Sequence, residues 1–177
     1  MSVIAANLQA VKNDIAAAAQ QAGRPVADVT LLAVSKTVSA ARVRQAFDAG
    51  QRAFGENYVQ EGLEKIAALD ALRSQIQWHF IGPLQSNKTR PVAEQFDWVH
   101  AIDRLKIAER LSAQRPAGLP PLQVCIQVNI SHEDTKSGVA PGEVPALAQA
   151  IAALPSLELR GLMAIPAPAA EPAAPRQ

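Results

Sequence analysis

The stretch Val29-Thr-Leu-Leu-Ala-Val-Ser-Lys-Thr37 decides the fold class of this chain of 177 residues. Its first six residues form an apolar run typical of a buried strand, its last three are polar, and a helical pattern follows over residues 40–49. Comparable apolar runs recur at residues 52–54, 76–81, 98–102, 122–130 and 157–165. We therefore expect six strands, of which the run at 52–54 is the weakest.

Helical patterns lie between these runs. An amphipathic helix opens the chain after Ser2, a possible N-cap, and Gly23 is placed to end it. A second helix is expected after Ser39, and further ones at residues 58–69, 89–96, 105–114 and 143–154. Alternating strands and crossover helices imply an α/β fold with parallel strands, either an open doubly wound sheet or a (β/α)8 barrel.

The length of the chain and its last residues bear on the extent of this fold. A complete barrel of eight units takes about 250 residues, and only six strands are expected here. Residues 166–177 are rich in Pro and Ala and follow a strand that would otherwise lead into a helix. We expect a single domain over residues 1–166, with residues 167–177 forming a disordered tail or a cut loop.

Composition narrows the class of partner and the compartment. The chain is 49% hydrophobic, which is enough for one core, and its formal charge of +1 provides no field that would attract nucleic acid or a lipid surface. We see neither a signal peptide nor an apolar run long enough to span a membrane. The single cysteine, Cys125, lies in an apolar run and is expected to be a small buried hydrophobe. Small-molecule partners and a cytoplasmic location are expected.

Lys36 is the most suggestive polar residue, because ligands of parallel α/β folds bind at the carboxyl ends of the strands. A lysine at the end of so apolar a run can be partly desolvated, which lowers its pKa and frees the neutral amine to form a Schiff base with an aldehyde. The alternative is that Lys36 simply extends into water. Position alone does not decide between the two.

Other strand ends also carry polar residues, namely Glu56, Asn57, Asp103, Asn129 and Ser131. His79 lies inside an apolar strand, so its ring nitrogens must be satisfied by the protein or by a ligand, and a structural role is the safer interpretation. His100 and His132 lack the spacing of metal ligands. We expect no metal site.

The segment Gly82-Pro-Leu-Gln-Ser-Asn-Lys-Thr89 supports an alternative function. It follows a strand, precedes a helix, and differs from the phosphate-binding loop of nucleotide hydrolases only by Asn87 in place of the second glycine. Against this, Pro83 has no N–H to offer a phosphate, and no other segment matches the acidic strand that would hold Mg²⁺. A nucleotide-binding function is therefore a weak alternative, and Asn87 and Lys88 could instead belong to the mouth of a pocket.

Five blocks of sequence, taken in order, resemble the pyridoxal phosphate homeostasis proteins. They are Leu31-Leu-Ala-Val-Ser-Lys-Thr37, Phe54-Gly-Glu-Asn-Tyr-Val-Gln-Glu61, Trp78-His-Phe-Ile-Gly-Pro-Leu-Gln-Ser-Asn-Lys88, Phe96-Asp-Trp-Val-His-Ala-Ile-Asp103 and Arg160-Gly-Leu-Met-Ala-Ile-Pro166. The resemblance extends from the first helix to Pro166. It implies a (β/α)8 TIM barrel like the N-terminal domain of alanine racemase.

The resemblance also implies a cofactor and its site. Lys36 matches the lysine that carries pyridoxal 5′-phosphate (PLP) as a Schiff base. Positions that match the lining of the pocket are Asn57, His79, Asn129 and Met163, while Ser86, Asn87, Lys88 and Lys136 lie in family blocks near its mouth.

Family members are thought to buffer PLP and deliver it, and they have no established catalytic turnover. The resemblance therefore implies a monomeric carrier rather than an enzyme, with PLP-dependent apo-enzymes as possible recipients. A PLP-dependent amino-acid racemase remains an alternative. Racemases of this fold obtain a catalytic tyrosine from a second domain, however, and Tyr58 is the only tyrosine here and is expected at a helix start.

Two departures from the family pattern matter. Many relatives carry a second lysine where this chain has Val38, so no role in cofactor transfer is carried over to that position. The family also continues with two more strand–helix units that hold the PLP phosphate, and these are not found in this sequence. We therefore expect a barrel truncated after about six strands, and a longer natural protein.

Overall fold

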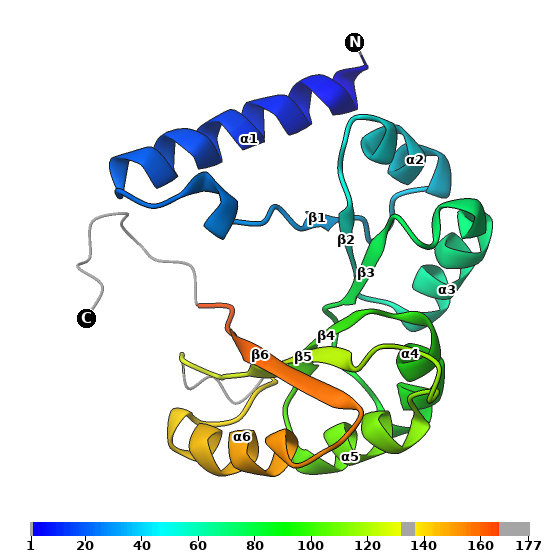
Figure 1. Cartoon of the computed structure of the whole chain (residues 1–177), viewed down its shortest axis with the longest axis vertical. Helices are drawn as coiled ribbons and strands as arrows, with labels where there is room; N and C mark the ends of the chain where they lie inside the picture. Colours follow the sequence, from blue (N-terminus) through cyan, green and yellow to red (C-terminus); the bar gives the residue numbers. More distant parts are fainter. Residues whose placement is uncertain (1, 132–136, 167–177) are drawn as a thin grey trace. The chain divides into compact units, whose positions relative to one another are not determined.

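The computed structural model describes residues 2–131 and 137–166. The chain divides into two compact units, one formed by residues up to Phe80 and the other from Ile81 onward. The described residues form six strands, as the sequence predicts, and helices alternate with them along the chain (Figure 1). Within the described residues, no helix is long and apolar enough to cross a membrane.

The first unit contains three parallel strands in the order β1-β2-β3. Its helices are α1 (Val3–Gln21), α2 (Ala40–Asp48) and α3 (Val59–Ala68), with short 3-10 turns η1 (Val26–Asp28) and η2 (Asp70–Leu72). The strands are β1 (Ala33–Val34), β2 (Ala53–Glu56) and β3 (Gln77–Phe80). In register, Ala33 lies opposite Phe54, and Phe54 opposite Trp78.

Local sequence explains where these helices begin and end. The Ser2 hydroxyl accepts a hydrogen bond from the Ala5 N–H at 3.2 Å, which confirms it as the N-cap of α1. Gly23 follows α1 at φ +62° and Gly50 follows α2 at φ +91°, conformations that glycine adopts without the cost a side chain would add. Ser39 precedes α2 as expected, but its side chain makes no capping hydrogen bond.

The first strand is shorter than predicted. The apolar run suggested a strand over residues 29–34, whereas β1 covers only Ala33–Val34. Val29 and Val34 are 39% and 51% exposed. Among the described residues of this unit, β1 pairs on one side only, with β2. Hydrophobicity alone does not make a strand, because each backbone N–H and C=O group needs a partner on a neighbouring strand.

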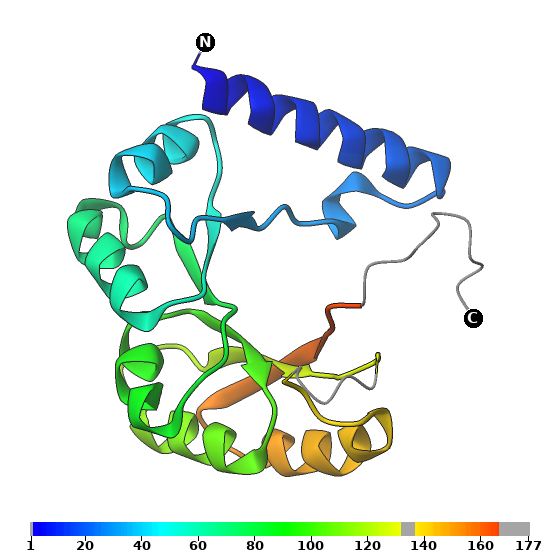
Figure 2. The same ribbon diagram turned by 180° about the vertical axis from the view of Figure 1, so that it is seen from behind.

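The second unit repeats the same alternation, with parallel strands in the order β4-β5-β6. Its strands are β4 (Trp98–Ile102), β5 (Leu122–Gln127) and β6 (Leu157–Met163). Its helices are α4 (Thr89–Gln95), α5 (Leu105–Gln114) and α6 (Val144–Ala152), with 3-10 turns η3 (Ser86–Lys88) and η4 (Pro141–Glu143). Seen from the front and from behind, these helices pack on the same side of the three strands (Figures 1 and 2).

Strands β5 and β6 end earlier than predicted, at Gln127 and Met163 instead of Ile130 and Ile165. After β5 the backbone changes partner. Val128 forms an isolated parallel bridge with Val139, and the Asn129 N–H donates to the Val139 carbonyl at 2.9 Å. The returning loop thus satisfies the backbone groups that a longer strand would have presented.

Both units have a well-packed interior. In the first, the rings of Phe54 and Trp78 lie 5.9 Å apart, centroid to centroid, and both are buried. In the second, Ile102, Ile107, Leu122 and Ile126 are fully buried. Cys125 is also buried, which raises the pKa of its thiol, so the prediction of a small buried hydrophobe is confirmed.

Candidate functional site

Lys36 lies in a tight turn directly after β1. The turn is closed by a hydrogen bond from the Val38 N–H to the Ser35 carbonyl at 3.0 Å. The Lys36 side chain is exposed, so the partial desolvation expected from the apolar run before it is not found. The reason is that β1 itself is short and half-exposed, and therefore provides no buried mouth for the side chain.

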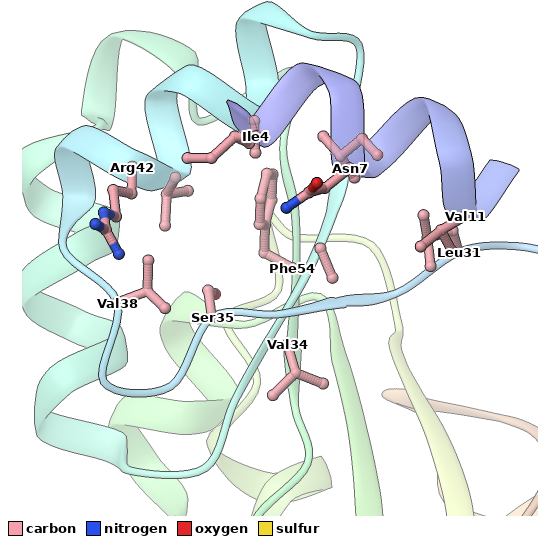
Figure 3. A pocket seen from close by; sticks show the side chains of 13 residues that line it. Ile4, Asn7, Val11, Leu31, Val34, Ser35, Val38, Arg42 and Phe54 are labelled. Atoms are coloured by element: carbon pink, nitrogen blue, oxygen red, sulfur yellow. The ribbon is translucent and has the colours of Figure 1, made fainter. Parts of the chain in front are cut away.

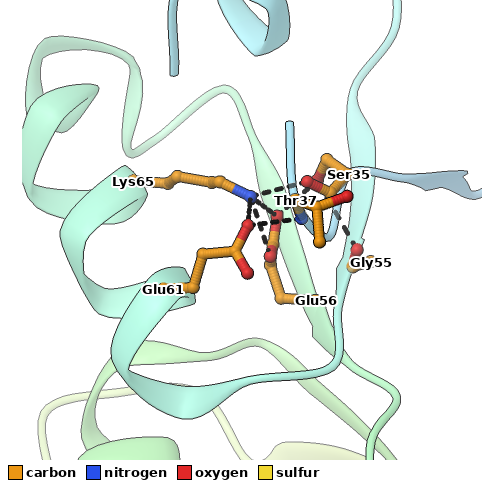
Figure 4. Close-up of polar contacts among 6 residues, drawn as sticks. All are labelled: Ser35, Thr37, Gly55, Glu56, Glu61 and Lys65. Carbon is orange, nitrogen blue, oxygen red and sulfur yellow. Dashed lines mark hydrogen bonds and ion pairs between the residues drawn. The ribbon is translucent and has the colours of Figure 1, made fainter. Parts of the chain in front are cut away.

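Charged side chains from β2 and α3 form hydrogen bonds with residues of this turn (Figure 4). Glu56 at the end of β2 is fully buried, and Lys65 of α3 is 5% exposed. Lys65 Nζ donates to both Glu56 oxygens, at 2.8 and 3.0 Å, and to Glu61 Oε1 at 2.6 Å. It also donates to the backbone carbonyl of Ser35 at 2.6 Å. We call Glu56, Glu61 and Lys65 the clamp cluster.

The residues on either side of Lys36 are both bound to this cluster. The Ser35 hydroxyl donates to Glu56 Oε1 at 2.5 Å, and the Thr37 N–H donates to Glu61 Oε1 at 2.5 Å. Thr37 has φ +61°, the only positive φ of a non-glycine residue among those described. For a β-branched residue this conformation costs about 1–3 kcal/mol, so the surrounding contacts must impose it.

The electrostatics of Glu61 follow from these contacts. The hydrogen bond from Lys65 holds the pKa of the Glu61 carboxyl below its ordinary value, and the Thr37 N–H adds to the effect, while partial burial opposes it. Glu61 is therefore ionised at neutral pH, as the two donors require.

Asn57 and His79 belong to the next two strand segments of the first unit after β1. Asn57 follows β2 directly, and its Oδ1 atom is buried without a hydrogen-bond partner in the part of the chain that the structure describes. His79 is buried in β3, opposite Gly55 of β2. Strand alternation places His79, Gly55 and Val34 on one face, and Gly55 contributes no side chain to it. A buried amide oxygen without a partner suits a polar ligand.

A cavity of about 330 Å³ is lined by residues of β1, α1 and α2, and Val34 and Ser35 are among them. Figure 3 shows side chains from α1, α2 and Phe54 pointing into it, including Ile4 and Asn7. Its walls are mostly apolar, and Lys36, Asn57 and His79 are not among them. The cavity is therefore distinct from the predicted cofactor site.

In the second unit, the predicted residue Met163 ends β6, and Asn129 lies two residues after the end of the neighbouring strand β5. Gln127 lies opposite Met163, and the Val128 N–H donates to the Met163 carbonyl at 2.8 Å. Asn129 is fixed by the returning loop through Gly138, which has φ +125°. A Cβ at Gly138 would lie 2.8 Å from the Asn129 backbone nitrogen, so the close approach requires glycine.

The predicted pocket-mouth residues Ser86, Asn87 and Lys88 form η3. Asn87 and Lys88 are exposed, and Lys136 lies outside the described residues. The Thr89 hydroxyl is buried, donates to the Ser86 carbonyl at 3.0 Å and accepts from Arg110 Nε at 3.2 Å. In a phosphate-binding loop this hydroxyl would contact Mg²⁺, and here it is already bonded within the protein. The geometry gives the nucleotide-binding alternative no support.

Sequence reasoning did not identify the clamp cluster as a unit. The signals available were the spacing of Glu61 and Lys65, four residues apart on a helix, and the position of Glu56 at a strand end. Nothing in the sequence indicated that Lys65 would be buried. Among the residues that the structure describes, no group of three or more His, Cys, Asp or Glu side chains could hold a metal ion.

Comparison with known proteins places the chain in a family. Residues 6–177 match the family model of the alanine racemase N-terminal domain. The pyridoxal phosphate homeostasis protein of Pseudomonas aeruginosa is 64% identical over 174 residues, which cover 98% of this chain and 75% of that protein. The protein of the same name from Escherichia coli K12 is 60% identical over 172 residues, 97% of this chain and 74% of that one.

A solved structure agrees with these matches. PipY of Synechococcus elongatus, determined with PLP bound, is 38% identical and superimposes with a TM-score of 0.75, covering 92% of this chain and 70% of PipY. The predicted TIM-barrel type of α/β fold is thereby confirmed. The chain belongs to the family of pyridoxal phosphate homeostasis proteins, which carry the fold of the alanine racemase N-terminal domain.

Proposed function

We propose that this protein binds PLP through a Schiff base on Lys36 and acts in PLP homeostasis. The observation that carries the proposal is the turn after β1, which presents the exposed amine of Lys36 from a backbone held on both sides. In the reaction, the neutral amine of Lys36 adds to an aldehyde carbonyl, and a water molecule leaves as the C=N bond forms. The bound cofactor supplies the aldehyde.

The neighbouring residues suit such a ligand. Asn57 Oδ1 is a buried acceptor that a polar group of the ligand could satisfy, and such an atom costs stability while it has no partner. His79 lies opposite Gly55 on the same sheet face, and Gly55 has no side chain that would obstruct a flat ring there. In the second unit we propose Asn129 and Met163 as further contacts, and Ser86, Asn87, Lys88 and Lys136 as residues of the mouth.

We further propose that the protein stores and delivers PLP without catalytic turnover. A racemase needs an acid and a base on opposite sides of the substrate carbon. The only tyrosine of the chain, Tyr58, is 60% exposed at the start of α3. The proposed recipients are PLP-dependent apo-enzymes in the cytoplasm, and the proposed carrier is a monomer with one domain over residues 1–166.

The Schiff base is tested by trapping it. The protein is saturated with PLP, reduced with borohydride, digested and analysed by mass spectrometry. We expect the pyridoxyl group on Lys36, and we expect the visible absorbance of the complex to be lost in Lys36→Ala. The control is Lys106→Ala, which removes an exposed lysine of α5 and should leave both results unchanged.

Two outcomes would contradict the proposal. One is a pyridoxyl group on a different lysine, and the other is a Lys36 that remains unmodified in the saturated protein. Exchange of the α-proton of alanine with deuterated water, at a rate that depends on Lys36, would instead favour the racemase alternative. Binding of ATP that requires Lys88 and Mg²⁺ would favour the nucleotide alternative.

A further inference from the structure

We infer that Glu56, Glu61 and Lys65 are positioning residues, which set the direction of Lys36 for Schiff-base formation by fixing the backbone on both sides of it. The inference rests on the proposed function of Lys36. None of the three side chains is proposed to touch the cofactor. Their effect is proposed to pass through Ser35 and Thr37, and Figure 4 shows the contacts of the three side chains with these two residues.

The backbone before Lys36 is fixed by three contacts. Lys65 Nζ binds the Ser35 carbonyl at 2.6 Å, and the Ser35 hydroxyl binds Glu56 Oε1 at 2.5 Å. The Ser35 N–H also donates to the Gly55 carbonyl at 2.9 Å, which continues the pairing of β1 with β2. Ser35 is buried, so water does not compete for these bonds.

The backbone after Lys36 is fixed by one contact of a different kind. The Thr37 N–H donates to Glu61 Oε1, the same oxygen atom that accepts from Lys65 Nζ. Thr37 is also the residue with the positive φ of +61°. A single carboxylate oxygen thus couples the strained residue after Lys36 to the lysine that binds the residue before it.

Stability alone does not account for so many buried charges. Taking a carboxylate and an ammonium out of water is costly, and well-packed apolar residues of similar size often stabilise a protein as well or better. What the cluster adds is a fixed orientation of the backbone on both sides of Lys36. The three N–H bonds of Lys65 are all used, on Ser35, Glu56 and Glu61. Its ammonium group is therefore held by the turn after β1, by β2 and by a residue of its own helix.

Fixing the backbone matters because the Lys36 side chain itself can adopt many conformations. Its side chain is long and exposed, and four carbon atoms separate the amine from the backbone. A flexible nucleophile reaches a bound aldehyde in the correct orientation only part of the time, and pre-organising the backbone raises that fraction.

The test compares two substitutions of Glu61 in the full chain. Glu61→Ala removes the acceptor of the Thr37 N–H, whereas Glu61→Gln retains a carbonyl oxygen in its place. Neither leaves Glu56 unpaired, because Lys65 still binds it. The control is Leu72→Ala, which removes a buried side chain of η2 that is not part of the clamp cluster. Lys65→Met is a second variant on the other side of the turn.

Two measurements are made on each variant. The first is the affinity for PLP, from titration of the Schiff-base absorbance. We expect Glu61→Ala to lose about tenfold or more, and Glu61→Gln to stay within about threefold of the parent protein, because a misplaced reacting group loses rate and affinity steeply. Leu72→Ala should unfold at a lower temperature and keep its affinity for PLP.

The second measurement is hydrogen exchange at the Thr37 N–H in the protein without PLP. We expect faster exchange in Glu61→Ala and in Lys65→Met, and little change in Glu61→Gln and Leu72→Ala. This readout separates the two proposals. If the parent protein forms no adduct on Lys36, the proposed function fails, while the exchange data still report on the clamp cluster.

If the parent protein forms the adduct, and Glu61→Ala matches Leu72→Ala in both measurements, the inference is overturned and the proposed function stands. Should Lys65→Met not fold, Glu61→Ala decides alone. Glu61 is only partly buried and its removal preserves the buried pair of Glu56 and Lys65.

Discussion

At the scale of single residues, the turn after β1 combines strain with tight bonding. Thr37 takes a backbone conformation that threonine disfavours. The hydrogen bond from its N–H to the Glu61 carboxylate stabilises this conformation. At Gly138 the backbone also has a positive φ, but here the residue is a glycine, which avoids the crowding that a side chain would cause beside Asn129.

The close approach of Gly138 to Asn129 predicts a specific sensitivity. Gly138→Ala should reduce the free energy of unfolding by about 1–3 kcal/mol, because its Cβ would meet backbone atoms and its φ of +125° disfavours a side chain. Urea denaturation measures the change. Gly118→Ala is the matched control, since a Cβ there meets no atom within 4 Å. Equal stability of the two variants would contradict the prediction.

The lowered pKa of Glu61 predicts a pH dependence of stability. A carboxyl whose pKa is lower in the folded state than its ordinary value of 4.5 stabilises the fold above that pH. The contribution is lost as the pH falls through the folded pKa. Thermal unfolding should therefore show a gap between the parent protein and Glu61→Gln that is constant from about pH 6 to 7 and narrows below about pH 4.5. A gap that widens in acid would contradict this assignment.

At the scale of elements, the clamp cluster joins β1, β2 and α3 through one buried ammonium group. The elements are brought together by apolar packing, as with Phe54 against Trp78, and the polar cluster then fixes their relative position. Surface ion pairs have no such effect. The pair of Arg44 and Asp48 on α2 is more than half exposed on both sides.

This contrast predicts the cost of breaking each pair. Lys65→Met should destabilise the protein by about 3–5 kcal/mol, because it leaves the Glu56 carboxylate buried without a cation. Arg44→Met should change stability by less than about 0.5 kcal/mol. The double variant Glu56→Gln with Lys65→Met should recover part of the loss, which chemical denaturation would measure. A double variant less stable than Lys65→Met would show that the two charges act independently.

At the scale of the whole molecule, two compact units each repeat the same pattern of a parallel strand followed by a helix. Each unit has its own buried core. The chain spans about three quarters of the curated relatives it matches. The family and the fold type follow from the whole chain, while the reactivity proposed for Lys36 depends on a few residues of the first unit.

The sequence by itself determined the order and type of the elements. The six strands and six α-helices of the described residues lie where periodicity and caps predict them, with ends that differ by a few residues. This succeeds because helix and strand periods are local properties of the chain. The blocks around Lys36 likewise identified the family and the proposed anchor, since both depend on residues adjacent in sequence.

Only the tertiary structure decided the length of β1, the exposure of Lys36 and the existence of the clamp cluster. A strand ends where its pairing partner ends, so the apolar run at residues 29–32 could not define it. Lys65 and the Ser35 carbonyl are 30 residues apart, and which face of α3 is buried depends on how that helix packs. A buried lysine has no local sequence signature, because burial is a property of the surroundings that the fold creates.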